Sequence, residues 1–511
     1  MISVSYKNEH LVDTDSPLYK KLLNAHERLL QKDNNIWGPE AATEASIRMD
    51  WIDLPNESRS LLAQLDSLFA KHRHLTNVIL CGMGGSSLGP EVIAHTFSKE
   101  LFILDSTDPN YLAHAIPKNL KDTLVVVGSK SGSTIETASQ KSFFEKLFEE
   151  AGLDKTEHMV IVTDPKSPLD LASRNAGLTV INANPNVGGR FSVLGAFGLV
   201  PAALIGIDVS IILDSAAETK ESLVADPHPA LLAAFAIISG TVQYFSITDQ
   251  DSKMPGLSDW VEQLVAESTG KNGIGRLPIV LKSSKDFENE KCLAISFVGD
   301  SDLVIKGDLG SQFFFWEWVT ALLGAGLSID PFNQPNVQEA KLASGQLLKE
   351  WKNSLPSLGD EGQSDSIAFF VQSPDVRTLL SEFLEQIDAD GYLAVMAYLD
   401  RKSDHELSEL QNILIRKIGK PVTFGWGPRF LHSTGQFHKG GQPNGSFLLI
   451  TADCSQDFQI PDKEFTFKTL AMAQAIGDQN ALQSRNLKTL RLHLKNRPAG
   501  IKELLEIAKS L

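Results

Sequence analysis

The chain has 511 residues, of which 42% are hydrophobic and 22% charged, as in an ordinary globular protein. This length is too great for a single hydrophobic core, so we expect two to four domains. The formal net charge of −16 argues against nucleic-acid binding, which needs a basic face. A small anionic substrate must therefore be held by local hydrogen-bond donors.

The cysteines and the apolar stretches suggest where the protein works. The three cysteines, Cys81, Cys292 and Cys454, are odd in number and far apart, which predicts a reducing compartment without disulfides or a zinc site. The first residues carry no signal-peptide pattern. Val193–Leu213 is apolar, but three glycines, a proline and an aspartate interrupt it, so we expect a buried core helix. We therefore predict a cytoplasmic protein that does not bind membranes.

The first part of the chain shows an α/β pattern. Residues 1–50 are polar and carry one helical pattern at Pro17–Gln31, which predicts an N-terminal helical extension. An amphipathic helix at Ser58–Lys71 lies near the start of a first domain over residues 51–225. Apolar strands then alternate with helices, which predicts a parallel sheet covered on both faces. These strands lie near Val78–Cys81, Leu101–Leu104, Leu124–Val127, Met159–Val162 and Leu178–Ile181.

A glycine-rich turn follows the first of these strands. Gly82 and Gly84 begin a G-x-G pattern, and Asp105 closes the next strand about 20 residues on, as in dinucleotide sites. The third glycine of that pattern falls at Ser87. This hydroxyl favours a smaller ligand than a nucleotide, and a nucleotide-dependent oxidoreductase stays open as an alternative.

A second turn, Ser129–Thr134, follows the strand at Leu124–Val127 and contains four hydroxyls, one lysine and one glycine. A strand-to-helix turn directs backbone N–H groups and the positive end of the helix dipole at one spot. With Lys130, this arrangement predicts a cup for a phosphate monoester. The alternative is a serine-rich loop that only caps a helix. Two hydroxyl-rich turns at the carboxyl ends of parallel strands favour the binding site.

Two charged residues stand out further along. Arg190 follows a glycine pair just before the apolar stretch, and it is either a solvated loop residue or a fixed guanidinium that faces a substrate oxyanion. Gln263 and Glu267 are four residues apart and share a helix face. A glutamate at a helix end is usually solvated. Here Ser-Thr-Gly-Lys follows it, which leaves a pocket role open.

The second half repeats the α/β alternation and predicts a second domain over residues 226–511. Residues 208–260 are expected to be helical, with Asp226–Pro229 as the domain junction. Residues 345–366 are polar and predict a linker or a surface excursion, within an inserted or rearranged segment at about 345–425. The last 45 residues are expected to be helical. Strands are expected near Leu277–Val280, Cys292–Val298, Ile367–Val371, Leu393–Tyr398 and Phe447–Ile450.

With these residues in view, the chain resembles the glucose-6-phosphate isomerase family, in particular the form that is the isomerase half of bacterial transaldolase–isomerase fusions. The resemblance runs through five motifs in the family's order: Gly82–Pro90, Ser129–Thr137, Val187–Leu199, Gln263–Lys271 and Asp330–Lys341. It implies two sugar-isomerase (SIS) domains, each a flavodoxin-like three-layer αβα sandwich with a mainly parallel sheet. It also implies a cytosolic homodimer that interconverts glucose 6-phosphate and fructose 6-phosphate without a cofactor or metal.

The resemblance assigns roles to individual residues. Glu267 matches the catalytic base, Arg190 the arginine that steadies the enediolate, Lys341 the active-site lysine and Gln263 a substrate-contacting glutamine. The phosphate and substrate binders match Gly85, Ser86, Ser129, Lys130, Ser131 and Thr134.

One position departs from the family pattern. The ring-opening histidine belongs between the base and the lysine, but Lys271–Lys341 contains no histidine. A similar His-Ser-x-Gly-Gln motif occurs after the lysine, at His432–Gln436. We therefore expect His432, or its neighbour His438, to open the ring, in its own subunit or in the partner.

Two other functions stay open. A non-catalytic SIS protein that senses a phosphosugar would keep the hydroxyl cups but would have no need for Arg190, Gln263, Glu267 and Lys341 together. An isomerase of mannose 6-phosphate or an amino-sugar phosphate would use the same chemistry on another substrate.

Overall fold

The computed structural model describes residues 2–7, 12–225, 228–287, 289–352, 354–355 and 362–511. The chain divides into two compact units. Unit 1 comprises residues 1–105, 117–284 and 289–334, and unit 2 comprises residues 106–116, 285–288 and 335–511.

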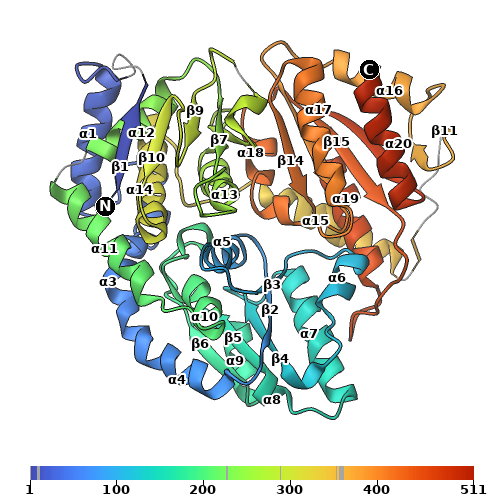
Figure 1. Ribbon diagram of the computed structural model, residues 1–511, viewed down its shortest axis with the longest axis horizontal. Coiled ribbons are helices and arrows are strands. Elements are labelled where there is room, and N and C mark those ends of the chain that lie inside the picture. The colour runs from blue at the N-terminus through green and yellow to red at the C-terminus, as the bar shows by residue number, and fades with distance from the viewer. Residues whose placement is uncertain (1, 8–11, 226–227, 288, 353, 356–361) are drawn as a thin grey trace. The chain divides into compact units, whose positions relative to one another are not determined.

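The first sheet of unit 1 is fully parallel, with the strand order β3-β2-β4-β5-β6. This is the flavodoxin-like order. Nearly all its strand residues are buried, which explains the continuous apolar runs in the sequence. Its strands are β2 (Asn77–Gly82), β3 (Phe102–Leu104), β4 (Thr123–Gly128), β5 (Met159–Thr163) and β6 (Thr179–Asn182). Figure 1 shows the accompanying helices α4 (Leu62–His72), α5 (Leu88–Thr96), α7 (Ile135–Glu150), α8 (Lys155–His158), α9 (Pro168–Asn175) and α10 (Ala196–Leu204).

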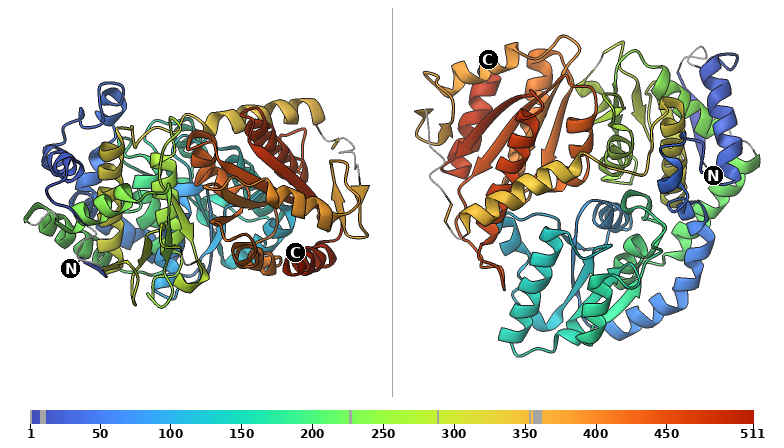
Figure 2. Two further views of the ribbon diagram at one scale, coloured as in Figure 1. Left: turned by 90° about the horizontal axis from the view of Figure 1, so that it is seen from above. Right: turned by 180° about the vertical axis from the view of Figure 1, so that it is seen from behind.

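The second sheet of unit 1 has the order β1-β10-β9-β7-β8. Its last four strands are parallel in a flavodoxin-like order, and β1 closes the edge in antiparallel pairing with β10. The strands are β1 (Ser3–Tyr6), β7 (Tyr244–Thr248), β8 (Leu277–Val280), β9 (Ala294–Ser296) and β10 (Leu303–Lys306). The helices are α1 (Pro17–Leu30), α11 (Ser210–Ala225), α12 (His228–Ser239), α13 (Leu257–Thr269) and α14 (Leu309–Leu327); α1 packs beside α12 and α14 (Figure 2).

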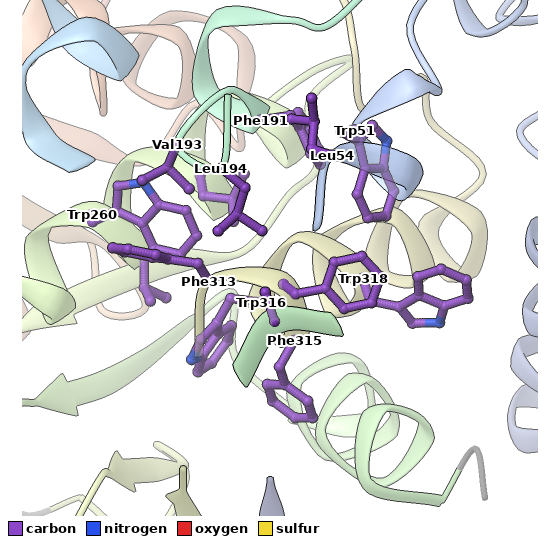
Figure 3. Close-up of a cluster of buried hydrophobic side chains, with 14 of the residues drawn as sticks. Trp51, Leu54, Phe191, Val193, Leu194, Trp260, Phe313, Phe315, Trp316 and Trp318 are labelled. Carbon is purple, nitrogen blue, oxygen red and sulfur yellow. The ribbon is translucent and has the colours of Figure 1, made fainter. Parts of the chain in front are cut away.

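An aromatic cluster forms the centre of unit 1 (Figure 3). The rings of Trp260 on α13 and Phe313 on α14 lie 4.8 Å apart, and those of Trp51 and Phe191 lie 5.4 Å apart. Such pairs contribute about 0.5–1.5 kcal/mol each beyond simple burial. Phe191 directly follows Arg190, so this core fixes both the arginine loop and the helix that carries Glu267.

Unit 2 contains a six-stranded sheet with the order β11-β12-β16-β15-β13-β14. Strands β14, β13, β15 and β16 are parallel and repeat the order of the second sheet, with β12 antiparallel at their edge. The strands are β11 (Gly362–Gln363), β12 (Ile367–Phe369), β13 (Tyr392–Ala397), β14 (Val422–Trp426), β15 (Gly445–Ala452) and β16 (Lys488–Leu494). The helices are α6 (Pro109–Ala115), α15 (Val337–Trp351), α16 (Val376–Glu385), α17 (Glu409–Ile418), α18 (Gly435–Gly440), α19 (Phe467–Gln483) and α20 (Arg497–Ser510).

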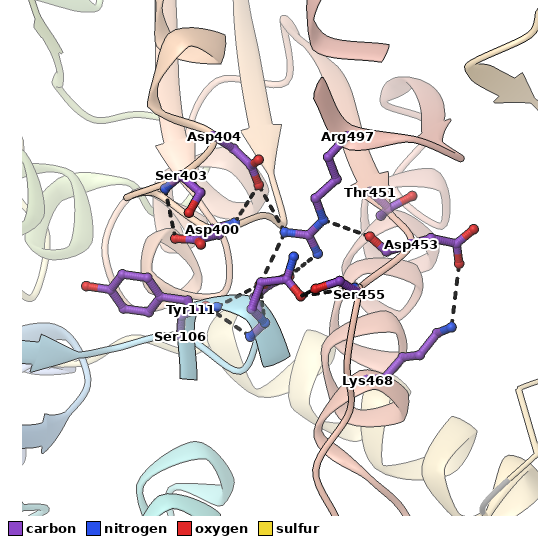
Figure 4. Close-up of polar contacts among 12 residues, drawn as sticks. Ser106, Tyr111, Asp400, Ser403, Asp404, Thr451, Asp453, Ser455, Lys468 and Arg497 are labelled. Atoms are coloured by element: carbon purple, nitrogen blue, oxygen red, sulfur yellow. Dashed lines mark hydrogen bonds and ion pairs between the residues drawn. The ribbon is translucent and has the colours of Figure 1, made fainter. Parts of the chain in front are cut away.

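A buried ion cluster ties α6 to the rest of unit 2 (Figure 4). Arg497 donates from Nη2 to Asp108 Oδ2 at 2.5 Å and from Nη1 to Asp404 Oδ2 at 2.9 Å. Its Nε donates to the Asp453 carbonyl at 2.7 Å. Burial lowers the pKa of Arg497, but Asp108 and Asp404 outweigh this effect and raise the pKa.

The predicted α/β class with mainly parallel sheets is confirmed, and every predicted strand corresponds to an observed one. The single second domain predicted over residues 226–511 differs from the observed division. Its strands separate into a sheet that ends at Lys306 and the sheet of unit 2. The chain on either side of the predicted junction at Asp226–Pro229 lies in unit 1, and Asp226 and Pro227 themselves lie outside the described residues.

Three local predictions were wrong. Tyr244–Thr248 is strand β7 within a region predicted to be helical, because a short buried strand has no distinguishing period. Lys488–Leu494 is strand β16 in the predicted C-terminal helices. The polar stretch from residue 345 begins inside helix α15, which continues to Trp351.

Membrane-spanning segments were also assessed. No single helix among the described residues is long and apolar enough to cross a membrane, while α11 and the greater part of α12 meet the length and composition test only when taken together as a bent pair. The predicted apolar helix at Val193–Leu213 is observed as the shorter buried helix α10 and the start of α11.

Candidate active site

The two hydroxyl-rich turns lie next to each other at the carboxyl ends of two neighbouring strands of the first sheet. Strands β2 and β4 are neighbours in register, with Gly82 opposite Gly128, so the turns that follow them lie side by side. A Cβ at Gly128 would lie 3.3 Å from the Cβ of Ser86, which shows how closely Ser86 sits over the end of β4. This is the crevice where ligands bind in open α/β sheets. The structure therefore brings Ser86 and the Ser129–Thr134 turn together as predicted.

The backbone of the Ser129–Thr134 turn is folded by its own hydroxyls. Ser129 Oγ accepts from the Gly132 N–H at 3.1 Å, and Ser131 Oγ accepts from the Ser133 N–H at 3.2 Å. Thr134 is the N-cap residue of α7, yet its side chain makes no capping hydrogen bond. The N-terminus of α7 therefore keeps its positive dipole end available to an anion.

Lys130, a residue of this turn, is paired with a carboxylate from outside the turn. Its Nζ lies 2.9 Å from Asp164, which follows β5. Burial lowers the pKa of Lys130, and Asp164 offsets this only in part. Burial likewise raises the pKa of Asp164 in spite of the lysine. A phosphate in the cup must therefore share the lysine with Asp164.

Gly85 joins the cup to the arginine loop. A Cβ at this position would lie 2.1 Å from the Gly189 carbonyl oxygen, so only glycine permits the contact. Because Gly189 precedes Arg190, this packing sets the arginine beside the cup.

Arg190 is buried and makes hydrogen bonds with all three guanidinium nitrogens. Nε donates to Ser268 Oγ at 2.7 Å, and Nη1 donates to Gln334 Oε1 at 2.9 Å. Nη2 donates to the carbonyls of Pro331 at 2.6 Å and Asn333 at 3.1 Å. Of the two interpretations of Arg190, the solvated loop residue is therefore wrong.

Glu267 lies directly beside this guanidinium. Its Oε1 is 3.3 Å from Arg190 Nη1, and its Oε2 accepts from Gln263 Nε2 at 3.2 Å. Glu267 is only 9% exposed although it lies at the C-terminal end of α13. Burial lowers the pKa of Arg190, and Glu267 and Asp330 act in the opposite direction. The structure thus groups Glu267, Gln263 and Arg190 in one buried cluster of unit 1.

The other two predicted catalytic residues belong to unit 2. Lys341 is exposed on α15, and His432 is half-buried at the end of a short 3-10 helix, Arg429–His432. A reciprocal amide pair links their elements: Asn336 N–H donates to Gln436 Oε1 at 2.9 Å, and Gln436 Nε2 donates to Asn336 Oδ1 at 2.8 Å. The His-Ser-x-Gly-Gln motif is therefore fixed to the first residues of the lysine helix.

The side chain of His438 is buried against aromatic side chains. Its Nδ1 lies 2.9 Å from the Tyr392 hydroxyl, and its ring stacks on Tyr392 and packs against Phe447. Burial, followed by the nearby Lys439, lowers the pKa of His438 well below its usual value. A neutral, buried imidazole of this kind is poorly placed to exchange protons with a substrate, which favours His432.

No local sequence pattern pointed to two groups that support the cluster. Asp50 Oδ2 accepts from the side-chain amides of Asn184 and Asn186 at 3.1 Å each, and Arg48 donates to the Pro185 carbonyl at 3.0 Å. These contacts join segments more than 130 positions apart, so no local pattern could reveal them. Lys271 lies in a recognised motif but had no assigned role.

Within the described chain no group of three or more His, Cys, Asp or Glu side chains is placed to hold a metal ion.

Comparison with known proteins shows which family part of the chain resembles. Residues 64–277 match the family model described as phosphoglucose isomerase. This part of the chain is similar to the phosphoglucose isomerase family. The matched region contains the hydroxyl-rich turns, Arg190, Gln263 and Glu267, and it ends before Lys341 and His432.

Among curated relatives, the glucose-6-phosphate isomerase of Citrifermentans bemidjiense is 36% identical over 260 residues, which is 46% of this chain and 48% of that protein. The glucose-6-phosphate isomerase of Campylobacter jejuni is 30% identical over 249 residues, which is 46% of this chain and 61% of that protein. The chain thus matches about half the length of these relatives. A crystal structure of a glucose-6-phosphate isomerase from Chlamydia trachomatis has the same fold, with a TM-score of 0.56 at 19% identity over 75% of this chain and 91% of that one.

Proposed function

We propose that the protein is a glucose-6-phosphate isomerase, which interconverts glucose 6-phosphate and fructose 6-phosphate in glycolysis and gluconeogenesis. The observation that carries this proposal is the buried contact of 3.3 Å between Glu267 Oε1 and Arg190 Nη1, next to the hydroxyl-rich cup. A base beside a fixed cation suits a reaction that passes through an enediolate. The family match over residues 64–277 supports the same reaction.

Glu267 moves the proton in this mechanism. Aldose–ketose isomerisation transfers a proton between C2 and C1, so a single carboxylate takes it from one carbon and returns it to the other. Gln263 holds Oε2, which leaves Oε1 facing Arg190 and the reacting carbons. Positioned proton transfer of this kind contributes about 10²–10⁴-fold to the rate.

Arg190 stabilises the enediolate oxygen. Its Nε and Nη2 are used by Ser268 and by the carbonyls of Pro331 and Asn333, so these bonds fix the guanidinium plane before substrate binds. Nη1 donates to Gln334 Oε1 and also faces Glu267, and we propose that it meets the developing negative charge. A preorganised donor of this type contributes roughly 10²–10³-fold.

The cup of Ser86 and Ser129–Thr134 binds the phosphate and orients the sugar. Its binding energy serves alignment because the phosphate is remote from the carbons that react. The reaction is redox-neutral, so we propose that it needs no cofactor. We propose further that His432 opens the sugar ring, that Lys341 contacts the substrate, and that the enzyme is a cytoplasmic homodimer.

A coupled assay tests the proposal. Fructose 6-phosphate is supplied with glucose-6-phosphate dehydrogenase and NADP, and formation of NADPH reports isomerisation. Parallel assays with mannose 6-phosphate and glucosamine 6-phosphate identify the substrate. Binding of these phosphates without turnover would overturn the proposal in favour of a phosphosugar-binding SIS protein.

A further inference from the structure

A buried ion pair joins two helices of unit 2. Lys439 lies on α18 and Asp478 on α19, and Lys439 Nζ is 2.7 Å from Asp478 Oδ1. The two side chains are 1% and 0% exposed. Among the described residues the Asp478 carboxylate has no hydrogen-bond partner besides this lysine. Each charge therefore depends on the other, because a lone charge in the interior is costly.

Lys439 connects this pair to the turn that follows His432. Its Nζ also donates to the carbonyl of Gly435, the first residue of α18, at 3.1 Å. Gly435 in turn lies against the 3-10 helix that ends at His432, since a Cβ at Gly435 would be 3.2 Å from the Phe430 carbonyl oxygen and 3.6 Å from Lys439 Nζ. A chain of contacts thus leads from Asp478 to the backbone that carries the histidine.

Helix α18 packs on both α15 and α19 (Figure 1). The reciprocal amide pair described above attaches it to α15. Arg485 adds to this attachment, because its Nη1 donates to the Lys439 carbonyl at 2.8 Å and its Nη2 donates to Glu339 of α15 at 2.5 Å. The ion pair attaches the same short helix to α19, so α18 is held on two sides.

The ion pair is expected to contribute more to position than to stability. Moving two charges out of water costs about as much as their attraction gains, so an apolar pair of similar volume is often equally stable. An apolar side chain, however, cannot donate to the Gly435 carbonyl. Asp478 supplies the opposite charge that lets Lys439 stay buried, and Lys439 uses its ammonium group to hold the start of α18.

Ring opening is the step for which this position matters. The C1–O5 bond breaks, the ring oxygen gains a proton, and the C1 hydroxyl loses one as C1 becomes the aldehyde carbon. An imidazole that transfers these protons must lie within hydrogen-bond distance of the sugar oxygens. A displacement of about 1 Å is therefore enough to slow the step strongly.

We propose that Lys439 and Asp478 are positioning residues for ring opening, which hold the Gly435 turn and, through it, the imidazole of His432. The inference rests on the proposed function and on ring opening by His432. Both side chains are enclosed, so they act through the backbone of the turn and do not contact the substrate.

The experiment compares the double variant Lys439→Met with Asp478→Leu and the wild type on two substrates. One is cyclic glucose 6-phosphate, and the other is an open-chain analogue that lacks the C4 and C5 hydroxyls and cannot cyclise. We expect the ratio of the two kcat/KM values, cyclic over open-chain, to fall about tenfold or more. The midpoint of urea unfolding stays close to that of the wild type, because the volume of the pair is kept.

Asp108→Ala is the control for lost stability. It breaks a different buried pair of unit 2, the contact of Asp108 with Arg497. We expect it to lower the midpoint of urea unfolding and to leave the ratio of the two kcat/KM values unchanged. The control and the double variant therefore change opposite quantities.

A second variant tests whether the pair acts through His432. Asp478→Asn keeps an oxygen that accepts from Lys439 but removes the opposite charge, so we expect the ratio to fall a few-fold. In the His432→Ala background the same substitution should add no further fall, because the group that is positioned is gone. This comparison also carries the test if the double variant does not fold.

The outcomes separate this inference from the proposals on which it rests. If His432→Ala lowers the ratio but neither Asp478→Asn nor the double variant does, the pair is purely structural and this inference alone is overturned. An undiminished effect of Asp478→Asn in the His432→Ala background would also overturn it. If His432→Ala leaves the ratio unchanged, ring opening by His432 fails together with this inference. A wild-type protein that isomerises none of the hexose phosphates would overturn the proposed function as well.

Discussion

Individual side chains of the buried cluster make clearly different contacts. Glu267 contacts Arg190 through one oxygen and Gln263 through the other, so its two oxygens are not equivalent. Arg190 is held by neutral partners on three sides, which fixes its plane. The two residues that we propose as base and charge stabiliser are thus joined in one ion pair.

Replacement of the base should separate chemistry from binding. Glu267→Gln keeps the size of the side chain but cannot accept a proton from carbon. We expect kcat to fall by about 10²–10⁴-fold, while the affinity for glucitol 6-phosphate changes only a few-fold. Steady-state kinetics and calorimetry measure the two effects, with the exposed Glu290→Gln as control. Activity within tenfold of the wild type would remove Glu267 from this role.

The two histidines of the His432–His438 segment are distinguished by their surroundings. His432→Ala should slow turnover of cyclic glucose 6-phosphate, because it removes the imidazole that we propose to open the ring. An open-chain analogue that cannot cyclise should react at closer to the normal rate. The ratio of the two rates is the measurement, and His405→Ala, an exposed histidine of unit 2, is the control. An equal ratio in His432→Ala and wild type would contradict ring opening by His432.

At the scale of elements, the segment before α3 (Leu54–Glu57) supports the loop that carries Arg190. Met49 pairs with Val187 in an isolated antiparallel bridge, and Asp50 binds Asn184 and Asn186 on the same loop. The expected N-terminal extension is therefore more than a cover, because its last residues are part of the support of the arginine.

Loss of this support should reduce catalysis from a distance. Asp50→Ala removes two hydrogen bonds to a charged acceptor, which are worth about 1.5–3 kcal/mol each at most. We expect a lower Tm and a several-fold lower kcat, with glucitol 6-phosphate affinity unchanged because the cup is built on β2 and β4. The exposed Asp66→Ala is the matched control. A fall in affinity with normal kcat would show that the segment supports the cup and leaves the arginine loop unaffected.

At the scale of the whole molecule, three sheets share one strand order. Strands β7–β10 and β13–β16 follow the same parallel sequence of neighbours, each with an antiparallel strand at the same edge. The carboxyl ends of β13 and β15 form the position equivalent to the cup of the first sheet. In unit 2, a small cavity at this position is lined by Arg497, Asp108, Tyr398 and Cys454. There the guanidinium of Arg497 is paired with the Asp108 carboxylate.

This ion pair should be important for the stability of unit 2. Asp108→Ala leaves the buried Arg497 with Asp404 as its remaining carboxylate and removes the N-cap of α6. Breaking a buried pair costs about 3–5 kcal/mol. Urea unfolding followed by circular dichroism should show this loss, and Asp390→Ala, at an exposed position, should not. A change below about 1 kcal/mol would mean that water replaces Asp108 around Arg497.

The sequence by itself determined the first sheet, the hydroxyl-rich turns and the Gln263–Glu267 face, because these depend on buried apolar runs and on residues close together in the chain. The tertiary structure decided the rest. Asp50 reaches its partners across 134 positions, Arg190 reaches Gln334 across 144, and strands β7 and β16 are too short for a period to distinguish them from helices. Contacts between distant segments leave no local pattern, so the division into two units and the support of the arginine became visible only in the folded chain.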